Sequence, residues 1–285
     1  MRSTLYVPGD QPDKMAKALG SGADALIFDL EDAVAPTAKL AAREMVCAFL
    51  AANRGAAPKL WVRINQGELG IADAAVLITH AGSNVAGLFV PKVDTLAELS
   101  ALETTVLLAE TNAGLLPGAV PFCALLETAG GVLRAAELAQ HPRVERIAIG
   151  EADLSSELGV ELTAGDEREL LFARSMLVLA ASAAGINPPI GPVSTNFRDL
   201  DAYRAGTVAL KRLGFVGRSA IHPAQVPVIN EVFTPTESEV IKAARLVELF
   251  DAAVAEGRGV CVDDHGKMVD EAVVRAARRT MLRAQ

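Results

Sequence analysis

The chain has 285 residues, of which 51% are hydrophobic and only 4% aromatic, so aliphatic side chains and alanine must build its core. A formal net charge of −8, without a basic stripe interleaved with aromatic residues, excludes nucleic acid as an expected partner. No apolar run approaches the roughly 18 residues that a membrane-spanning helix needs. Three widely separated cysteines, no CxxC pair and no signal-peptide pattern predict a cytoplasmic protein without disulfides.

Short apolar runs alternate with helix-forming segments along most of the chain. The alternation predicts βαβ units and a parallel sheet. Eight units favour closure into a (β/α)8 TIM barrel over an open Rossmann-type sheet, and the first βα turn, Pro8-Gly9-Asp10-Gln11, lacks the GxGxxG of that alternative. The eight runs lie at about 3–8, 25–30, 59–64, 87–92, 121–127, 146–150, 186–190 and 214–221.

Helix boundary signals support this division. Thr95 and Glu98 form a capping box after the fourth run, and a helix over 166–184 ends at Gly185. Thr234 to Glu237 form a second capping box, which opens a helix–turn–helix extension. We therefore predict a barrel over residues 1–233 and an extension over 234–285. Composition leaves the extension open as a lid, an oligomer arm or a plug at the bottom of the barrel.

Several apolar runs end in charged residues. In a barrel, the carboxyl ends of the strands carry the chemistry. Glu127 and Asp153 follow the fifth and sixth runs, and two converging carboxylates must share a proton or a cation. Oxygen ligands from only two side chains suit Mg²⁺, which keeps waters and leaves positions for substrate oxygens. We predict a Mg²⁺ site there, since an ion pair or a helix cap would explain one such acid but not two.

Arg63 projects from the end of the third run. A guanidinium can hold a carboxylate with two parallel hydrogen bonds, so an arginine beside a metal predicts an anionic substrate such as an α-keto or hydroxy acid. The alternative is a buried ion pair with Asp29, Glu31 or Asp32, which end the second run. Both hold if these acids orient Arg63 and the waters of the metal.

With these motifs the chain resembles the citrate lyase β-subunit-like family, which includes malyl-CoA and citramalyl-CoA lyases. The similar residues span nearly the whole chain in the expected order. They are Arg2-Ser3 with Pro8-Gly9, Asp29-Leu30-Glu31-Asp32, Val62-Arg63-Ile64-Asn65, Pro91-Lys92, Glu127, Gly150 with Asp153-Leu154, Ile221-His222-Pro223-x-Gln225 and Gly266-Lys267-Met268-Val269-Asp270.

The resemblance implies a Mg²⁺-dependent carbon–carbon lyase that cleaves or forms a 3-hydroxyacyl-CoA thioester, yielding an acyl-CoA and an α-keto acid. It also implies a homo-oligomer, trimeric or hexameric. The implied roles are Mg²⁺ ligation by Glu127 and Asp153, binding of the keto acid by Arg63, and binding of its carboxylate by the backbone of Gly150, Glu151 and Ala152. Arg2, Lys14 and Arg43 would meet the CoA phosphates, Glu31 and Asp32 would support catalysis, and Asp270 would be an acid/base from a neighbouring subunit.

Two other functions stay open. One is a subunit that acts only within a multiprotein lyase complex, on a thioester carried by an acyl carrier protein. The other is a CoA-independent pyruvate aldolase. Such an aldolase is expected to place a histidine base early in the barrel, and no histidine precedes His80 here.

Overall fold

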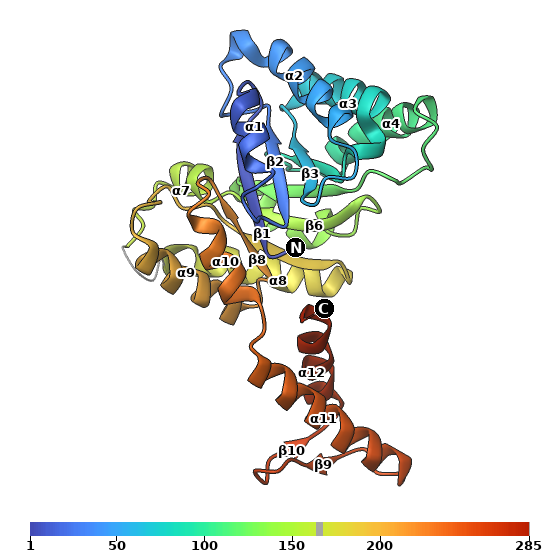
Figure 1. The fold of residues 1–285 in the computed structure, drawn as a ribbon, viewed down its shortest axis with the longest axis vertical. Coiled ribbons are helices and arrows are strands. Elements are labelled where there is room, and N and C mark those ends of the chain that lie inside the picture. The colour runs from blue at the N-terminus through green and yellow to red at the C-terminus, as the bar shows by residue number, and fades with distance from the viewer. Residues whose placement is uncertain (164–167, 285) are drawn as a thin grey trace. The chain divides into compact units, whose positions relative to one another are not determined.

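The computed structural model of the chain describes residues 1–163 and 168–284 and contains a closed barrel of eight parallel strands, each paired with the next and the last with the first. This confirms the predicted (β/α)8 barrel, whose strands β1, β2, β3, β6 and β8 are labelled in Figure 1. All eight predicted runs are strands. They are β1 (Ser3–Pro8), β2 (Ala25–Asp29), β3 (Lys59–Arg63), β4 (Gly87–Val90), β5 (Phe122–Leu126), β6 (Val144–Ile149), β7 (Asn187–Gly191) and β8 (Gly217–Ala220).

Helices follow the strands and cover the outside of the barrel (Figure 1). The barrel helices are α1 (Pro12–Ala18), α2 (Lys39–Ala52), α3 (Gly67–Ala81), α4 (Leu96–Asn112), α5 (Ala129–Leu133), α6 (Ala135–Leu138), α7 (Glu151–Leu158), α8 (Leu171–Ala184), α9 (Leu200–Leu213) and α10 (Gln225–Phe233).

The helix boundaries agree with the sequence signals except at one cap. The capping box of Thr95 and Glu98 is present at the start of α4, and α8 ends at Gly185, whose φ of 71° is left-handed. The predicted start of that helix at residue 166 lies outside the described residues. The predicted box at Thr234 is wrong, because Thr236 and Glu239 form it instead. The same Thr-x-x-Glu spacing recurs two residues later, and there the Thr236 hydroxyl accepts from the Glu239 backbone N–H while the Glu239 carboxylate accepts from the Thr236 backbone N–H.

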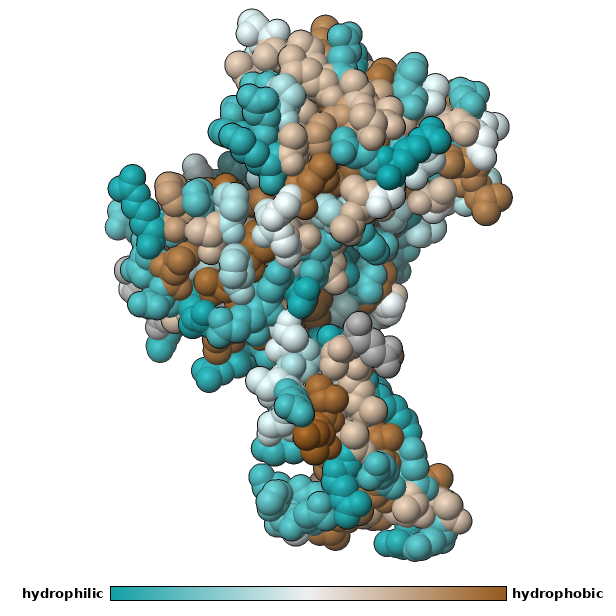
Figure 2. Space-filling view, in the orientation of Figure 1, coloured by the Kyte–Doolittle hydropathy of each residue, from teal (hydrophilic) through white to brown (hydrophobic). Residues whose placement is uncertain are grey.

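Aliphatic residues and a few aromatic rings fill the barrel interior. A central cluster contains Trp61 and Phe89, whose rings meet edge to face at a centroid distance of 5.5 Å, together with smaller aliphatic side chains from the other strands. On the face visible in Figure 2, hydrophobic and hydrophilic residues are intermixed. Among the described residues, no helix has the length and apolarity to cross a membrane.

The chain divides into two compact units, Met1–Asn230 and Glu231–Gln285. The second unit contains α11 (Glu237–Ala255), a two-stranded antiparallel sheet and α12 (Glu271–Arg283). The strands of that sheet are β9 (Cys261–Val262) and β10 (Met268–Val269). A small core of Phe250, Val269 and Val274 holds this unit together.

Candidate active site

A cavity of about 400 Å³ opens at the carboxyl ends of the barrel strands. One part of its wall is apolar and the other part is charged, as at the active sites of parallel barrels. Its lining comprises Tyr6, Pro8, Asp29, Asp32, Ala33, Arg63, Leu125, Glu127, residues 148–153, Val193, Ser219 and Ile221.

Arg63 and Asp29 form an ion pair at one side of this cavity. The parallel register of β2 and β3 places Asp29 directly beside Arg63. Arg63 Nε and Nη2 donate to the two carboxylate oxygens of Asp29 at 2.7 and 2.6 Å. The face of the Tyr6 ring lies 5.2 Å from the guanidinium carbon. Burial alone would lower the pKa of Arg63, but the hydrogen bonds to Asp29 raise it, so the arginine stays charged.

Two further acids lie against Arg63. Its Nη1 is 2.8 Å from Glu31 Oε2 and 3.4 Å from Asp32 Oδ2. Glu31 is buried, whereas the Asp32 side chain is 57% exposed. Three of the five guanidinium N–H donors make hydrogen bonds, two to Asp29 and one to Asp32, and Glu31 pairs with Nη1 as an ion pair. The structure therefore contains the predicted ion-pair arrangement.

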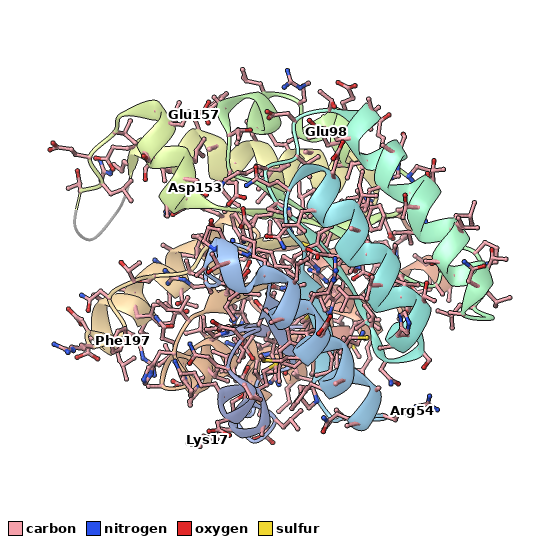
Figure 3. The ribbon with its side chains drawn as sticks, turned by 90° about the horizontal axis from the view of Figure 1, so that it is seen from above. Lys17, Arg54, Glu98, Asp153, Glu157 and Phe197 are labelled. Carbon is pink, nitrogen blue, oxygen red and sulfur yellow. The ribbon has the colours of Figure 1, made fainter. Side chains whose placement is uncertain are left out.

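Glu127 and Asp153 lie on neighbouring strand ends. Glu127 follows β5 and is 3% exposed, and its Oε1 accepts a hydrogen bond of 3.0 Å from the backbone N–H of Lys92. Asp153 lies in the first turn of α7, and its Oδ2 is 3.2 Å from Lys92 Nζ. Figure 3 shows Asp153 on the inward-facing start of α7, whereas Glu157 lies further along the same helix, toward the periphery.

Negative charge exceeds positive charge in this part of the cavity. Burial first, and then the neighbouring carboxylates of Glu31 and Asp153, raise the pKa of the Glu127 carboxyl to about 8, against the opposing effect of Arg63. Burial also raises the pKa of Glu31. A carboxyl that is buried among other carboxylates ionises readily only when a further cation is bound.

The donor set fits Mg²⁺ better than a transition metal. Within residues 1–163 and 168–284, no group of three or more His, Cys, Asp or Glu side chains is arranged to hold a metal. A cation held by Glu127 and Asp153 alone must therefore complete its coordination with waters or substrate oxygens, as Mg²⁺ commonly does. Gly150 also matters here, because a Cβ on it would lie 2.3 Å from Glu127 Oε2 and fill the space beside this carboxylate.

The start of α7 forms another wall of the cavity. Gly150 is its N-cap residue and makes no side-chain cap, so the first N–H groups of the helix have no capping side chain. Such a helix terminus favours an anionic group. The Glu151 carboxylate does not compete for this place, because it pairs with Arg174 of α8, with Oε2 2.6 Å from Nη2. Thus Gly150, Glu151 and Ala152 line the cavity, as predicted, through their backbone.

Besides the buried Glu31, four predicted residues lie outside the cavity lining. Arg2 precedes β1, at the strand end opposite to the cavity, where its guanidinium pairs with Asp24 at 2.7 Å. This position does not support the predicted contact of Arg2 with CoA phosphates at the mouth of the cavity. Lys14 is an exposed residue of α1. Arg43 points toward the buried Asp73, at 3.4 Å, and its side chain is only 15% exposed, so it is not presented to a phosphate at the surface.

The fourth is Asp270, which belongs to the second unit. Its Oδ1 accepts a hydrogen bond of 3.0 Å from the backbone N–H of Val273 and caps α12. Its role as an acid/base stays a prediction.

Lys92 is a site residue that the sequence analysis missed. Its Nζ lies between Glu31 Oε1 and Asp153 Oδ2, at 3.4 and 3.2 Å. Its φ of 50° is left-handed, a conformation that non-glycine residues adopt rarely and mostly at functional sites. The signal was present, since Lys92 follows the fourth apolar run just as Arg63 follows the third.

Comparison with known proteins gives a consistent result. The model of the HpcH/HpaI aldolase/citrate lyase family matches residues 2–223. A (3S)-malyl-CoA thioesterase of Cereibacter sphaeroides is 38% identical over 100% of this chain and 94% of its own length. The citrate lyase subunit beta of Escherichia coli K12 is 36% identical over 100% of this chain and 93% of its own.

A solved structure extends the likeness to the fold. It is the crystal structure of CitE from Mycobacterium tuberculosis in complex with magnesium, acetoacetate and coenzyme A. It matches with a TM-score of 0.77 and 28% identity, over 99% of this chain and 97% of that one. These findings confirm the resemblance drawn from the sequence motifs.

Proposed function

The chain belongs to the HpcH/HpaI aldolase/citrate lyase family, and from this premise we propose that it is a Mg²⁺-dependent lyase acting on a 3-hydroxyacyl-CoA thioester of the malyl-, citramalyl- or citryl-CoA type. Its products are an acyl-CoA and an α-keto acid. One observation carries the proposal: the buried Glu127 and the neighbouring Asp153 face the Arg63 ion-pair cluster across a single cavity. This arrangement can bind a metal cation and a negatively charged substrate oxygen next to each other.

The residues of the chain have distinct roles in this reaction. Glu127 and Asp153 would hold Mg²⁺, the cofactor, which when bound would supply Lewis-acid stabilisation of the oxygen that becomes negatively charged. Arg63 directs its uncommitted N–H groups toward the keto-acid portion of the substrate. The start of α7 binds the substrate carboxylate through backbone N–H groups. Lys14, exposed on the helix that follows β1, is the remaining candidate for the CoA phosphates.

Cleavage breaks the bond between C2 and C3 of the acyl group. The hydroxyl on C3 loses its proton and becomes the carbonyl of the α-keto acid, while the electron pair of the bond passes to C2 as an acyl-CoA enolate. A proton must then reach C2. We assign this proton to Asp270 of a neighbouring subunit, so that the active assembly is a homo-oligomer.

Two relatives point to alternatives. Because one relative is named a malyl-CoA thioesterase, hydrolysis of the thioester to a free hydroxy acid and CoA is the second candidate reaction. Because another is a citrate lyase subunit, a carrier-bound thioester within a complex is the alternative to a free CoA thioester.

Product analysis separates these reactions. The purified protein with Mg²⁺ is incubated with malyl-, citramalyl-, citryl- and 3-hydroxy-3-methylglutaryl-CoA, and keto acid, acyl-CoA and free thiol are quantified. The lyase predicts equal amounts of keto acid and acyl-CoA without early free thiol, and loss of turnover with EDTA or in Glu127→Gln. Free thiol without keto acid would identify the thioesterase instead. Inertness toward all four esters, relieved by an acyl carrier protein loaded with the same acyl group, would identify the complex subunit.

A further inference from the structure

A buried polar cluster lies behind the loops that carry Glu31 and Arg63. Lys39, at the start of α2, donates all three of its ammonium hydrogens: to the carbonyl oxygens of Leu30 and Glu31 at 3.0 and 2.8 Å, and to Asn65 Oδ1 at 2.6 Å. The backbone N–H and the side-chain amide of Asn65 both donate to Asp73 Oδ2, at 3.0 and 2.7 Å. The cluster thus connects three segments that are distant in sequence.

A buried cluster of charged and amide side chains is energetically less favourable than apolar packing at the same place, so a purely structural role does not explain it. Asn65 is 4% exposed and Asp73 is fully buried. Taking an ionised carboxylate out of water is energetically unfavourable, and apolar side chains of similar volume would pack there at least as stably. Burial raises the pKa of Asp73, whereas the hydrogen bonds from Asn65 and the neighbouring Arg43 lower it. A polar cluster fixes directions as well as distances, which apolar packing does not.

The cluster fixes the orientation of backbone and side-chain groups at the candidate active site. Leu30 and Glu31 lie just past the end of β2. There the hydrogen bonds from Lys39, in place of hydrogen bonds between strands, hold their carbonyl groups. On the other side, Gln66 follows Asn65 directly and donates to Glu31 Oε1 at 2.7 Å. The Glu31 backbone and carboxylate are therefore held from both loops, and that carboxylate contacts Arg63 and Lys92.

We propose that Lys39, Asn65 and Asp73 are positioning residues of the active site, which fix the Glu31 carboxylate and, through it, the groups of Arg63 and Lys92 that face the anionic portion of the substrate. The part that concerns the substrate rests on the proposed function. The part that concerns Glu31 rests on the contacts alone.

The first test needs no substrate. Lys39→Met keeps most of the side-chain volume but removes three hydrogen bonds, and Lys59→Met, at the exposed start of β3, is the matched control. The amides of Glu31 and Ala33 bond to the Asp29 carboxylate and report on the loop. We expect hydrogen exchange at residues 29–34 to accelerate about tenfold or more in Lys39→Met and to stay unchanged in the control.

The second test is a double-mutant cycle in turnover. We expect Lys39→Met to lower kcat about 10- to 100-fold with a smaller change in KM, as loss of an outer hydrogen-bonding partner typically does. In the Glu31→Gln background the same change should cost less than about threefold, because the group that it positions is already altered. Equal factors in both backgrounds would contradict the proposal. Asp73→Asn, a smaller change, should show the same pattern if Lys39→Met does not fold.

The two tests separate the inference from the proposed function. If the wild type turns over no thioester but the loop loosens in Lys39→Met, the proposed function fails and the positioning of Glu31 stands. If the wild type is active and Lys39→Met neither loosens residues 29–34 nor slows turnover, the positioning role is overturned.

Discussion

Arg63 shows how a single side chain combines a structural and a chemical role. Its guanidinium donates twice to Asp29 and also contacts Glu31 and Asp32. The ion pairs keep it charged and fix its orientation at the wall of the cavity, so the N–H groups that they leave uncommitted are held in place. Preorganised donors of this kind stabilise developing charge without reorganisation during the reaction.

This arrangement predicts the effect of a conservative change. Arg63→Lys keeps the charge but replaces a planar fork by a single ammonium, which cannot satisfy both oxygens of Asp29 and still face the substrate. We expect kcat/KM to fall about 100-fold or more, a loss near that of one oxyanion-stabilising donor. Steady-state kinetics measure it. Arg54→Lys, on an exposed arginine labelled in Figure 3, is the control and should leave kcat/KM unchanged. Comparable activity of both variants would contradict the role of the fork.

Gly150 is a second residue on which the site depends. An added Cβ would lie 2.3 Å from Glu127 Oε2 and 2.5 Å from Glu127 Cβ, so this carboxylate would have to move. We expect Gly150→Ala to weaken Mg²⁺ binding about 10- to 100-fold, the typical effect of displacing a ligand's supporting contacts. Titration calorimetry with Mg²⁺ measures it. Gly20→Ala, where the new Cβ would lie at an ordinary contact distance of 3.8 Å from the Lys17 carbonyl oxygen, is the control. Unchanged affinity in Gly150→Ala would argue against Glu127 as a ligand.

At the scale of elements, the strand ends were predictable and the contacts between loops were not. The apolar runs are each followed by a turn, so the sequence places Arg63, Glu127 and Asp153 at one rim once the strands are parallel. The cluster of Lys39 and Asn65 depends on how two βα loops pack, and no local pattern encodes that distance. Lys92 is an intermediate case. Its position after β4 was predictable from the sequence, but its contacts with Glu31 and Asp153 were not.

The same scale includes an ion pair that anchors α4 to the segment before β6. Arg143 Nη1 and Nη2 donate to the Glu110 carboxylate at 2.6 and 2.8 Å, and Glu110 also accepts from the backbone N–H groups of Gly118 and Val120. Burial alone would raise the pKa of Glu110, but these hydrogen bonds hold it below its ordinary value of 4.5. The ionised form therefore stabilises the fold.

Removal of this carboxylate should destabilise the protein in a pH-dependent way. We expect Glu110→Gln to lower the free energy of unfolding by about 3 kcal/mol at neutral pH, because the buried Arg143 loses its bidentate carboxylate and keeps only the half-buried Glu103 as an ionic partner. Since the folded-state pKa is depressed, the wild-type advantage is complete well above pH 4.5 and diminishes as the pH falls below that value. Urea unfolding at several pH values measures it, with the exposed Glu44→Gln as control. A difference that is constant down to acid pH would contradict this origin.

At the scale of the whole molecule, the repeat of strand and helix stops where the second unit begins. We predicted a barrel over residues 1–233, and the first compact unit ends at Asn230. No comparable sequence pattern predicts how the chains associate. The amphipathic pattern of α12 predicts an apolar contact for one face of this helix. The pattern does not indicate whether that contact lies in the same chain or in another chain.

Asp270 allows this association to be tested, because it is the N-cap of α12. Asparagine caps a helix about as well as aspartate, whereas alanine costs roughly 1 kcal/mol. We therefore expect Asp270→Asn to keep the thermal stability of the wild type and Asp270→Ala to lower it. If Asp270 supplies the proton, both variants should lose about 100-fold or more in kcat, the usual contribution of a general acid. Full activity in Asp270→Asn would leave this residue a cap alone.

Mixing variants then shows which chain supplies the acid. In a closed oligomer where Asp270 completes the site of a neighbour, unfolding and refolding a 1:1 mixture of Asp270→Asn and Glu127→Gln chains creates sites with an intact barrel and an intact acid, about one quarter of the total. Each parent alone should be inactive, so recovered turnover near that fraction identifies a site shared between chains. If Asp270 instead serves its own barrel, every chain in the mixture carries one defect, and no activity should return.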